Sequence, residues 1–444
     1  MSWLDQVDAG LLEGAIRIVR ALREAGHQAY FAGGAVRDFL LSRPVSDIDI
    51  ATSAEPREIE SLFPTTLPVG RQFGVIVVVE GPHQFEVATF RRDLGYTDGR
   101  HPAAVAFSNA VEDARRRDFT INGLFYDPET ESVIDYVDGQ EDLKRRIIRT
   151  VGDAEARFAE DKLRMMRAIR FACELDFAIE PSTYRELVAQ GGKIIQVSSE
   201  RIRDELLKIL TGRAPARGLE LLLDSGLLAV VLPEVAAMAG VPQPPEFHPE
   251  GDVFVHTCLM FRRAGARTPE LAMGILLHDV GKPPTFKIAE RIRFDGHAEV
   301  GAKMADTICR RLRLPNDTLH EVVDLVRDHL RFMHVREMRE STLKRFLRKE
   351  NFRDHLELHR LDCLASHGDL TNYEFCVRKL AEFSQEAIRP RPLLSGHDLI
   401  RAGLEPGPLF SKILAALEDA QLEGRITSRE EAMEWLRRTW LEER

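Results

Sequence analysis

The sequence predicts an α+β protein, in which a small mixed sheet with helices is followed by domains that are helical throughout. Two observations predict this class. Short runs of β-forming residues alternate with helical segments up to about residue 140, and from residue 141 onward the apolar spacing is almost entirely helical. Size agrees, because 444 residues correspond to about two to four domains.

The first domain is expected to occupy residues 1–140. Residues 8–25 have the spacing of an amphipathic helix, and residues 35–41 have helical character. Strand-like runs cover residues 29–32, 48–51, 75–79 and 85–89. This order of elements predicts a mixed sheet covered by helices.

The rest of the chain divides at changes of composition. We expect a helical neck over residues 141–213, a helical connector over 214–249, a metal-binding domain over 250–370 and a helical tail over 371–444. Ser198-Ser199 is a capping signal for a helix over residues 200–210. Proline-rich breaks at 242–249 and 390–392 support the later boundaries.

Composition excludes several classes of protein. With 44% hydrophobic and 30% charged residues, the chain is neither disordered nor fibrous. Its longest apolar runs, 73–79 and 271–277, are too short to cross a bilayer, and residues 1–5 lack a signal pattern. Five cysteines without a C-x-x-C pair indicate neither disulfides nor a cysteine-rich zinc site. A cytoplasmic enzyme without a membrane partner or an obligate protein partner is therefore expected.

The sharpest motif is Gly33-Gly34-Ala35-Val36-Arg37-Asp38, followed by Asp47-Ile48-Asp49. Glycines where a strand turns into a helix let a triphosphate approach backbone N–H groups. Asp47 and Asp49, two apart on a strand, would face the same side and suit Mg²⁺, with Glu86 from a neighbouring strand as a third carboxylate. Two such ions activate an attacking hydroxyl and stabilise a pyrophosphate leaving group. An isolated D-x-D is usually a turn or a cap, but here it is coupled to the glycine turn.

A second motif, Arg117-Asp118-Phe119-Thr120-Ile121-Asn122, has the side chains needed to bind a nucleotide. Arginine pairs with phosphate oxygens, whereas Asp118 and Asn122 can hydrogen-bond a ribose 2′-hydroxyl. A solvent-exposed, salt-bridged loop is the plainer alternative for the arginines at 115 and 116.

These separated motifs resemble those of the class II tRNA nucleotidyltransferases, the family of CCA-adding enzymes and bacterial poly(A) polymerases. The resemblance implies that Asp47 and Asp49 bind catalytic metals and act with Glu86. It further implies that the nucleotide is bound by a larger set of residues: Gly33, Gly34, Arg37, Arg117, Asp118, Asn122, Asp161, Arg164 and Arg167. Gly123 stands where the family usually has alanine. Asp135-Tyr136-x-x-Gly139-x-x-Asp142 resembles the family's hinge between head and neck.

In the neck, Glu160-Asp161-Lys162-Leu163-Arg164 is expected to begin a helix in which Asp161 and Arg164 share a face. An ordinary ion pair is one interpretation. Base selection is the other, because a carboxylate accepts from the amino group of C or A and repels the carbonyl of U or G. The resemblance assigns that selection to this pair. The segment from Ser199 to Leu206 resembles the last neck motif, which is expected to buttress the neck helices.

Two further segments bear on which nucleotides are added. Residues 92–102 are polar and contain glycine, and they resemble a mobile loop that CCA-adding enzymes retain. Residues 67–74 lack the second basic residue of the poly(A) polymerase signature, because Gln72 follows Arg71. CCA addition is therefore favoured, with A-only addition or poly(A) polymerase activity as the alternative.

The rear half contains histidines and aspartates in the order H…HD…D. The candidate metal ligands are His256, His278, Asp279, His297, His329 and Asp362. This set suits one or two divalent ions, Mn²⁺, Ni²⁺ or Mg²⁺, and resembles the HD phosphohydrolase superfamily. A degenerate, purely structural domain is the alternative. Other histidines, including those at 320, 334, 355 and 359, are expected to be exposed.

The tail, residues 393–444, resembles the closing segment of HD-containing tRNA nucleotidyltransferases. The whole sequence therefore predicts a two-metal enzyme that adds CCA to the tRNA 3′ end from CTP and ATP, with an HD domain that acts on RNA ends. Two rival hypotheses are an HD phosphohydrolase with a vestigial head and a non-catalytic RNA-binding protein.

Overall fold

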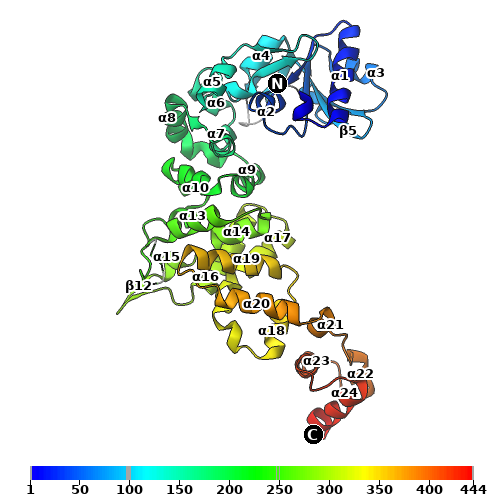
Figure 1. Cartoon of the computed structure of the whole chain (residues 1–444), viewed down its shortest axis with the longest axis vertical. Helices are drawn as coiled ribbons and strands as arrows, with labels where there is room; N and C mark the ends of the chain where they lie inside the picture. The colour runs from blue at the N-terminus through cyan, green and yellow to red at the C-terminus, as the bar shows by residue number, and fades with distance from the viewer. Residues whose placement is uncertain (1–2, 97–101, 247, 250, 443–444) are drawn as a thin grey trace. The chain divides into compact units, whose positions relative to one another are not determined.

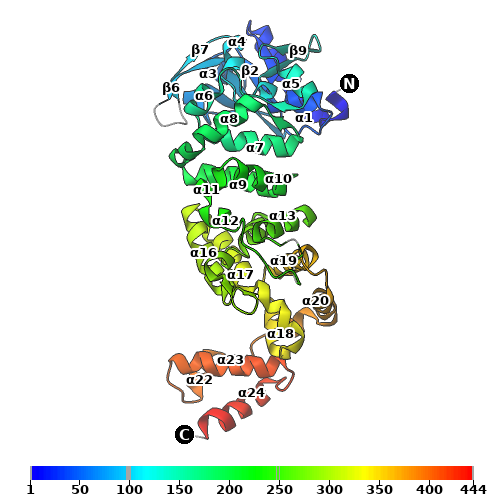
Figure 2. The ribbon, with the colours of Figure 1, turned by 90° about the vertical axis from the view of Figure 1, so that its left-hand side faces the viewer.

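A computed structural model describes residues 3–96, 102–246, 248–249 and 251–442. The chain forms two compact units, residues 1–236 and residues 237–444 (Figures 1 and 2). The break lies inside the predicted connector, residues 214–249. The helices up to Ala236 therefore belong to the first unit.

The first unit begins with a seven-stranded mixed sheet in the order β3-β4-β5-β2-β1-β8-β9. Only β2 and β5 run parallel, and the other neighbours are antiparallel. The strands are β1 (Ala29–Ala32), β2 (Asp49–Thr52), β3 (Thr66–Leu67), β4 (Val75–Glu80), β5 (His83–Thr89), β8 (Leu124–Asp127) and β9 (Ser132–Asp135). The four strands expected from the sequence are all present, so the mixed-sheet head is confirmed.

Helices and short turns connect the strands of this sheet. They are α1 (Ala9–Glu24), α2 (Gly34–Leu40), α3 (Pro56–Leu62), α4 (Ala110–Arg115) and α5 (Gly139–Arg145), with 3₁₀ turns η1 (Trp3–Asp5), η2 (Arg71–Phe73) and η3 (Thr120–Asn122). Helix α1 begins where the sequence indicates, because the Asp8 carboxylate accepts the Leu11 N–H at 3.0 Å. Its buried apolar face includes Ile18 and Leu22, neither of which is exposed.

The segment predicted as a mobile loop, residues 92–102, is partly a β-ribbon. β6 (Arg91–Tyr96) pairs antiparallel with β7 (Pro102–Phe107) from Arg91↔Phe107 to Tyr96↔Pro102. A loop was therefore wrong for the ends of this segment, whose backbone groups pair with each other. Residues 97–101 lie outside the described residues.

The remainder of the first unit is a helical layer. Its helices are α6 (Ala154–Glu160), α7 (Leu163–Leu175), α8 (Pro181–Gln190), α9 (Ser199–Thr211), α10 (Pro215–Asp224), α11 (Leu227–Val231) and α12 (Pro233–Ala236), with the turn η4 (Gly191–Gln196). One short parallel pair, β10 (Ile147–Ile148) with β11 (Ala178–Ile179), departs from the all-helical expectation.

In its described residues, the second unit is helical apart from the hairpin of β12 (Lys287–Ile288) and β13 (Ile292–Arg293). Its first helices are α13 (Val253–Arg263), α14 (Pro269–Leu277), α15 (Lys282–Thr285), α16 (His297–Arg311), α17 (Asn316–Asp328), η5 (His329–Glu337), α18 (Glu340–Leu347), α19 (Phe352–Ala365) and α20 (Thr371–Glu382). The chain ends in α21 (Gln385–Ile388), α22 (Gly396–Arg401), α23 (Pro408–Leu422), α24 (Arg429–Leu436) and the π-helical turn η6 (Arg437–Leu441). Leu399, Ile413 and Leu417 belong to a separate small core in this last part.

Among the described residues, no helix is both long and apolar enough to span a membrane.

Candidate functional sites

The glycine turn between β1 and α2 lies directly beside a carboxylate and an arginine. Gly33 has φ +70°, a left-handed conformation that favours glycine. A Cβ atom there would lie 2.9 Å from Nη1 of Arg117 and 3.9 Å from Oδ2 of Asp49. Three segments that are distant in sequence therefore meet at this turn.

The three predicted carboxylates lie at neighbouring strands. Asp49 begins β2 and faces Ala32 of β1, whereas Glu86 lies on β5, one residue before the Ile50↔Val87 pair. Asp47 precedes β2 rather than lying on it, and its side chain is exposed. The pKa of Asp49 is raised to about 6, mainly by burial. The negative charges of Glu86 and Asp47 also raise it, whereas the positive charge of Arg117 lowers it.

This carboxylate group has the chemistry of a Mg²⁺ site. Its oxygens are hard ligands, and the pKa of Asp49 is raised first by burial and then by the negative charges of Glu86 and Asp47, which a cation would neutralise. The residues present therefore fit the predicted metal. The three carboxylates do not converge as closely as the ligands of the second unit described below.

Behind the glycine turn, a buried chain of hydrogen bonds links the head to the neck. Arg37 Nη1 donates to Asn122 Oδ1 at 2.7 Å, and Asn122 Nδ2 donates to Asp118 Oδ1 at 3.1 Å. The second oxygen of Asp118 accepts from Nε and Nη2 of Arg167 on α7, at 2.9 and 2.6 Å. Burial alone would raise the pKa of Asp118, but Arg167 and Asn122 hold it well below its usual range. This aspartate is therefore ionised and fixed in place.

Arg117 is held by a residue that the sequence analysis did not single out. Its Nη2 donates to Oδ2 of Asp113 at 3.1 Å, and its Nη1 donates to the Asn122 carbonyl at 3.1 Å. Asp113 is almost fully buried on α4, four residues before Arg117. That i,i+4 spacing was the available signal.

The expected pairing of Asp161 with Arg164 is wrong in this structure. Helix α6 ends at Glu160 and α7 begins at Leu163, so Asp161 lies between two helices and does not share a helical face with Arg164. The break arises because Asp161 Oδ1 accepts the Leu163 N–H at 3.0 Å. Asp161 pairs with Arg201 of α9, and Arg164 pairs with Glu160 at 2.6 Å.

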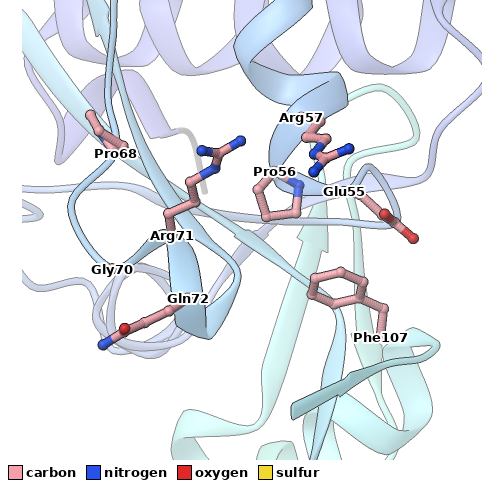
Figure 3. Close-up of a pocket in the computed structure, with 8 residues that line it drawn as sticks. All are labelled: Glu55, Pro56, Arg57, Pro68, Gly70, Arg71, Gln72 and Phe107. Carbon is pink, nitrogen blue, oxygen red and sulfur yellow. The ribbon is translucent and has the colours of Figure 1, made fainter. Parts of the chain in front are cut away.

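A pocket of about 680 Å³ lies elsewhere on the head (Figure 3). It is lined by the start of α3 and by η2, and the side chains of Arg57 and Arg71 lie on either side of Pro56. Because Glu55 follows the far end of β2, this pocket and Asp49 lie at opposite ends of that strand. Residues 67–74 therefore contribute to a surface separate from the carboxylate group.

The second unit brings all six predicted HD ligands together in two groups of three. His256, His278 and Asp362 form one group, and Asp279, His297 and His329 form the other. Within each group the possible ligand atoms lie within 4.8 Å of one another, and no other such group occurs in the described part of the chain. His278 Nε2 and Asp279 Oδ2, one from each group, are 3.1 Å apart.

Backbone carbonyls orient the histidine rings of this site. Nδ1 of His278, His297 and His329 lies 2.9, 2.9 and 2.6 Å from the carbonyl oxygen three residues earlier. That contact places the proton on Nδ1 and leaves Nε2 to bind a metal. Burial lowers the pKa of His329 to about 3, so its ring is neutral, as a ligand must be. The donor set therefore fits one or two divalent ions.

Lys282 is a member of this site that the sequence analysis missed. Its ammonium group is buried, 2.7 Å from Oδ2 of Asp279, and it donates to Oε1 of Gln243 at 2.6 Å. Burial would raise the pKa of Asp279, but His278 and Lys282 hold it well below its usual range. The signal was present, because a lysine follows His278-Asp279 after two residues.

Members of both metal-ligand groups line a cavity of about 1220 Å³. Asp279, His297, His329 and Asp362 line it, together with Arg291 and Arg293 of the β12–β13 hairpin. His359 also lines the cavity, and His355 lies on the same helix; their exposed fractions are 7% and 1%. The expectation that both histidines are exposed was wrong, because the face of α19 that carries them is buried and the His359 ring stacks on Phe332.

Three family descriptions match separate parts of the chain. Residues 29–149 match the family described as the poly A polymerase head domain. Residues 176–238 match a probable RNA and SrmB-binding site of polymerase A, and residues 253–357 match the HD domain. The fold and sites define the class: a polymerase-type nucleotidyltransferase that carries an HD domain.

Individual relatives show to which nucleotidyltransferase family the chain belongs. The CCA-adding enzymes of Geobacillus stearothermophilus and Levilactobacillus brevis are 48% and 46% identical over 216 residues, which is 48% of this chain. The chain spans about half the length of these curated relatives in the match, 53% and 54%. A crystal structure of the Bacillus stearothermophilus CCA-adding enzyme with CTP has a TM-score of 0.75 at 30% identity, over 98% of this chain and 99% of that one. The chain belongs to the tRNA nucleotidyltransferase family that includes the CCA-adding enzymes.

A more distant structure shares the fold. The Thermotoga maritima CCA-adding enzyme complexed with tRNA has a TM-score of 0.60 at 20% identity, over 97% of this chain and 96% of that one.

Proposed function

We propose that this protein adds C, C and A to the 3′ end of tRNA from CTP and ATP and releases pyrophosphate. The observation that carries the proposal is the meeting of the Gly33 turn, Asp49 and Arg117 at one point of the sheet. A glycine turn, a carboxylate group and an arginine together suit a nucleoside triphosphate with its metal. The named CCA-adding relatives support the same activity.

The residues have separate tasks in this reaction. Asp47, Asp49 and Glu86 would hold Mg²⁺, which supplies positive charge at the reacting phosphate. Arg117, fixed by Asp113, pairs with phosphate oxygens of the nucleotide. The Gly33 and Gly34 backbone lets the triphosphate come close, because no Cβ atom stands in its way.

The ribose is proposed to lie against the buried chain at the head–neck junction. Asp118 is ionised and held by Arg167, and Asn122 is held by Arg37, so both side chains keep one orientation. Because the Asp118 carboxylate and the Asn122 amide can both hydrogen-bond a hydroxyl, their fixed positions favour a nucleotide with a 2′-hydroxyl. Asp161 and Arg164 are proposed to select the base. Asp161 is held by Arg201 and Arg164 by Glu160, rather than by each other.

A single experiment tests this function. Purified protein is incubated with tRNA that ends at the discriminator base, at C or at CC, with one labelled nucleotide at a time. We expect CMP on the first two substrates and AMP on the third, with Asp49→Ala inactive. Addition of A alone to every substrate would instead indicate the A-adding or poly(A) alternative, and no addition at all would contradict the proposal.

A second activity is proposed for the HD site, because members of both ligand groups line one cavity together with two arginines. Such a site suits hydrolysis of phosphate esters at RNA ends with Mn²⁺, Ni²⁺ or Mg²⁺. Conversion of a 2′,3′-cyclic nucleotide to its 2′- or 3′-monophosphate, tested with each metal in turn, checks it. A cytoplasmic location is proposed with both activities.

A further inference from the structure

The Asp161 carboxylate, which is proposed to select the base, accepts hydrogen bonds on both oxygens from Arg201, a residue of α9 forty positions further along the chain. Arg201 Nη1 donates to Oδ1 at 3.2 Å and Nη2 donates to Oδ2 at 2.7 Å. This two-pronged contact is the geometry in which a planar guanidinium fits a carboxylate. Both side chains are largely buried, with exposed fractions of 15% for Asp161 and 20% for Arg201.

The contacts leave a defined amount of bonding capacity on the carboxylate. An ionised carboxylate accepts about four hydrogen bonds. Oδ1 accepts from the Leu163 N–H and from Arg201, whereas Oδ2 accepts from Arg201. One position, on Oδ2, therefore remains to accept from the amino group of an incoming base.

We propose that Arg201 is a positioning residue for nucleotide selection, an inference that rests on the proposed function. Its two hydrogen bonds fix the plane of the Asp161 carboxylate and so aim Oδ2 at the incoming base. A carboxylate in this state accepts from the amino group of C or A and repels the carbonyl of U or G. Without Arg201, the Asp161 carboxylate can rotate, so selection weakens.

A purely structural task for Arg201 is the competing explanation, since α7 and α9 pack together in the neck. That packing has its own supports. Nε of Arg170 donates to Oε1 of the buried Glu205 at 2.5 Å, and Ile202 and Leu206 of α9 are buried. Removing Arg201 therefore should leave the two helices in place, and its effect should fall on the choice of nucleotide.

The test compares Arg201→Gln and Arg201→Lys with Lys208→Gln, which removes one positive charge from an exposed position on the same helix. The kcat/KM of CTP and UTP is measured on tRNA ending at the discriminator base, and that of ATP and GTP on tRNA ending in CC. Equilibrium Kd values for CTP and UTP, and thermal melting, are measured in parallel.

For Arg201→Gln we expect the CTP:UTP and ATP:GTP ratios to fall by about tenfold, the size of one good contact to a base edge. The ratio of Kd values should shift in the same direction, with Tm little changed. Arg201→Lys keeps the positive charge but loses the two-pronged guanidinium contact, so its CTP:UTP and ATP:GTP ratios should lie between those of Arg201→Gln and the wild type. Lys208→Gln should keep wild-type ratios.

Several results would overturn the proposal. If Arg201→Gln lowers the kcat/KM of all four nucleotides equally, so that the ratios do not change, Arg201 is a packing residue only. Wild-type ratios in Arg201→Lys would show that the two-pronged contact does not contribute to selection. If Arg201→Gln does not fold, Arg201→Lys alone decides. A wild-type protein that adds no nucleotide would remove the proposed function and this inference together, whereas a selective wild type with an equally selective Arg201→Gln would remove only the inference.

Discussion

At Asp49, burial together with the charges of Glu86 and Asp47 raises the pKa to about 6, against an unfolded value of about 3.9. The folded protein therefore binds this proton more tightly than the unfolded chain. The contribution of Asp49 to stability is present below about pH 4 and is lost as pH rises to about 6. Asp49 thus carries a cost in stability above about pH 6 when no cation is bound.

Asp49→Asn removes that cost. We expect the metal-free variant to be more stable than the wild type by about 1–3 kcal/mol above pH 6, with the difference shrinking to near zero by pH 4. Urea unfolding in the presence of a chelator measures this, because groups common to both proteins cancel in the difference. A constant difference across that range would show that Asp49 is not perturbed, and nucleotide addition should be lost at every pH.

The residues of the sites could be predicted unequally well. Gly33 and Asp49 were predicted from one short motif, and the six HD ligands from the His278-Asp279 pair together with the order of the histidines and aspartates around it. Their partners were not, since Arg201 reaches Asp161 across forty residues and Gln243 reaches Lys282 across thirty-nine. A single sequence contains no signal for such pairs, because their members are distant along the chain and meet only in the folded structure.

At the scale of elements, the predictable features were those set by local backbone chemistry. Strand β1 and helix α1 have clear apolar periodicity and a capping aspartate, and both lie where the sequence indicates. The break between α6 and α7 was not predicted, because no glycine or proline marks it and Asp161 itself interrupts the helix by accepting the Leu163 N–H. The β6–β7 ribbon was missed because its polar, glycine-containing sequence is also typical of loops.

One close approach of elements gives a test at this scale. Gly139 begins α5, where the Asp135 carboxylate accepts the N–H groups of Val137 and Gly139. A Cβ atom on Gly139 would collide with the carbonyl oxygen of Thr120 in η3 and lie 2.9 Å from Cδ2 of Leu124. Gly139→Ala should therefore force η3 and α5 apart and destabilise the first unit by about 1–3 kcal/mol.

Chemical unfolding monitored by circular dichroism measures this loss. Gly192→Ala is the matched control, because a Cβ atom there meets no atom within 4 Å and the backbone needs no positive φ. The control should be neutral or slightly stabilising. Equal stabilities for Gly139→Ala and the wild type would mean that η3 and α5 do not approach as closely as the structure indicates.

At the scale of the whole molecule, the two units contain separate chemistries. All the proposed nucleotide-binding residues lie before Ala237, and both metal-ligand groups lie after it. His278→Ala combined with Asp279→Ala should therefore remove metal-dependent hydrolysis of 2′,3′-cyclic phosphate while CMP and AMP addition to tRNA continues at near the wild-type rate. Labelled-nucleotide addition and the opening of the 2′,3′-cyclic phosphate to a monophosphate, measured on the same preparation, check the two expectations.

Metal binding gives this prediction a readout that does not depend on activity. A ligand that binds only the folded state at 100 times its Kd stabilises that state by about 2.7 kcal/mol. Mn²⁺ or Ni²⁺ should accordingly raise the Tm of the wild type, and the double variant should lose most of that shift because each group of three ligands loses one member. A variant that melts normally yet no longer adds nucleotides would show that the HD site takes part in addition, and the assignment of the two chemistries to separate units would then be wrong.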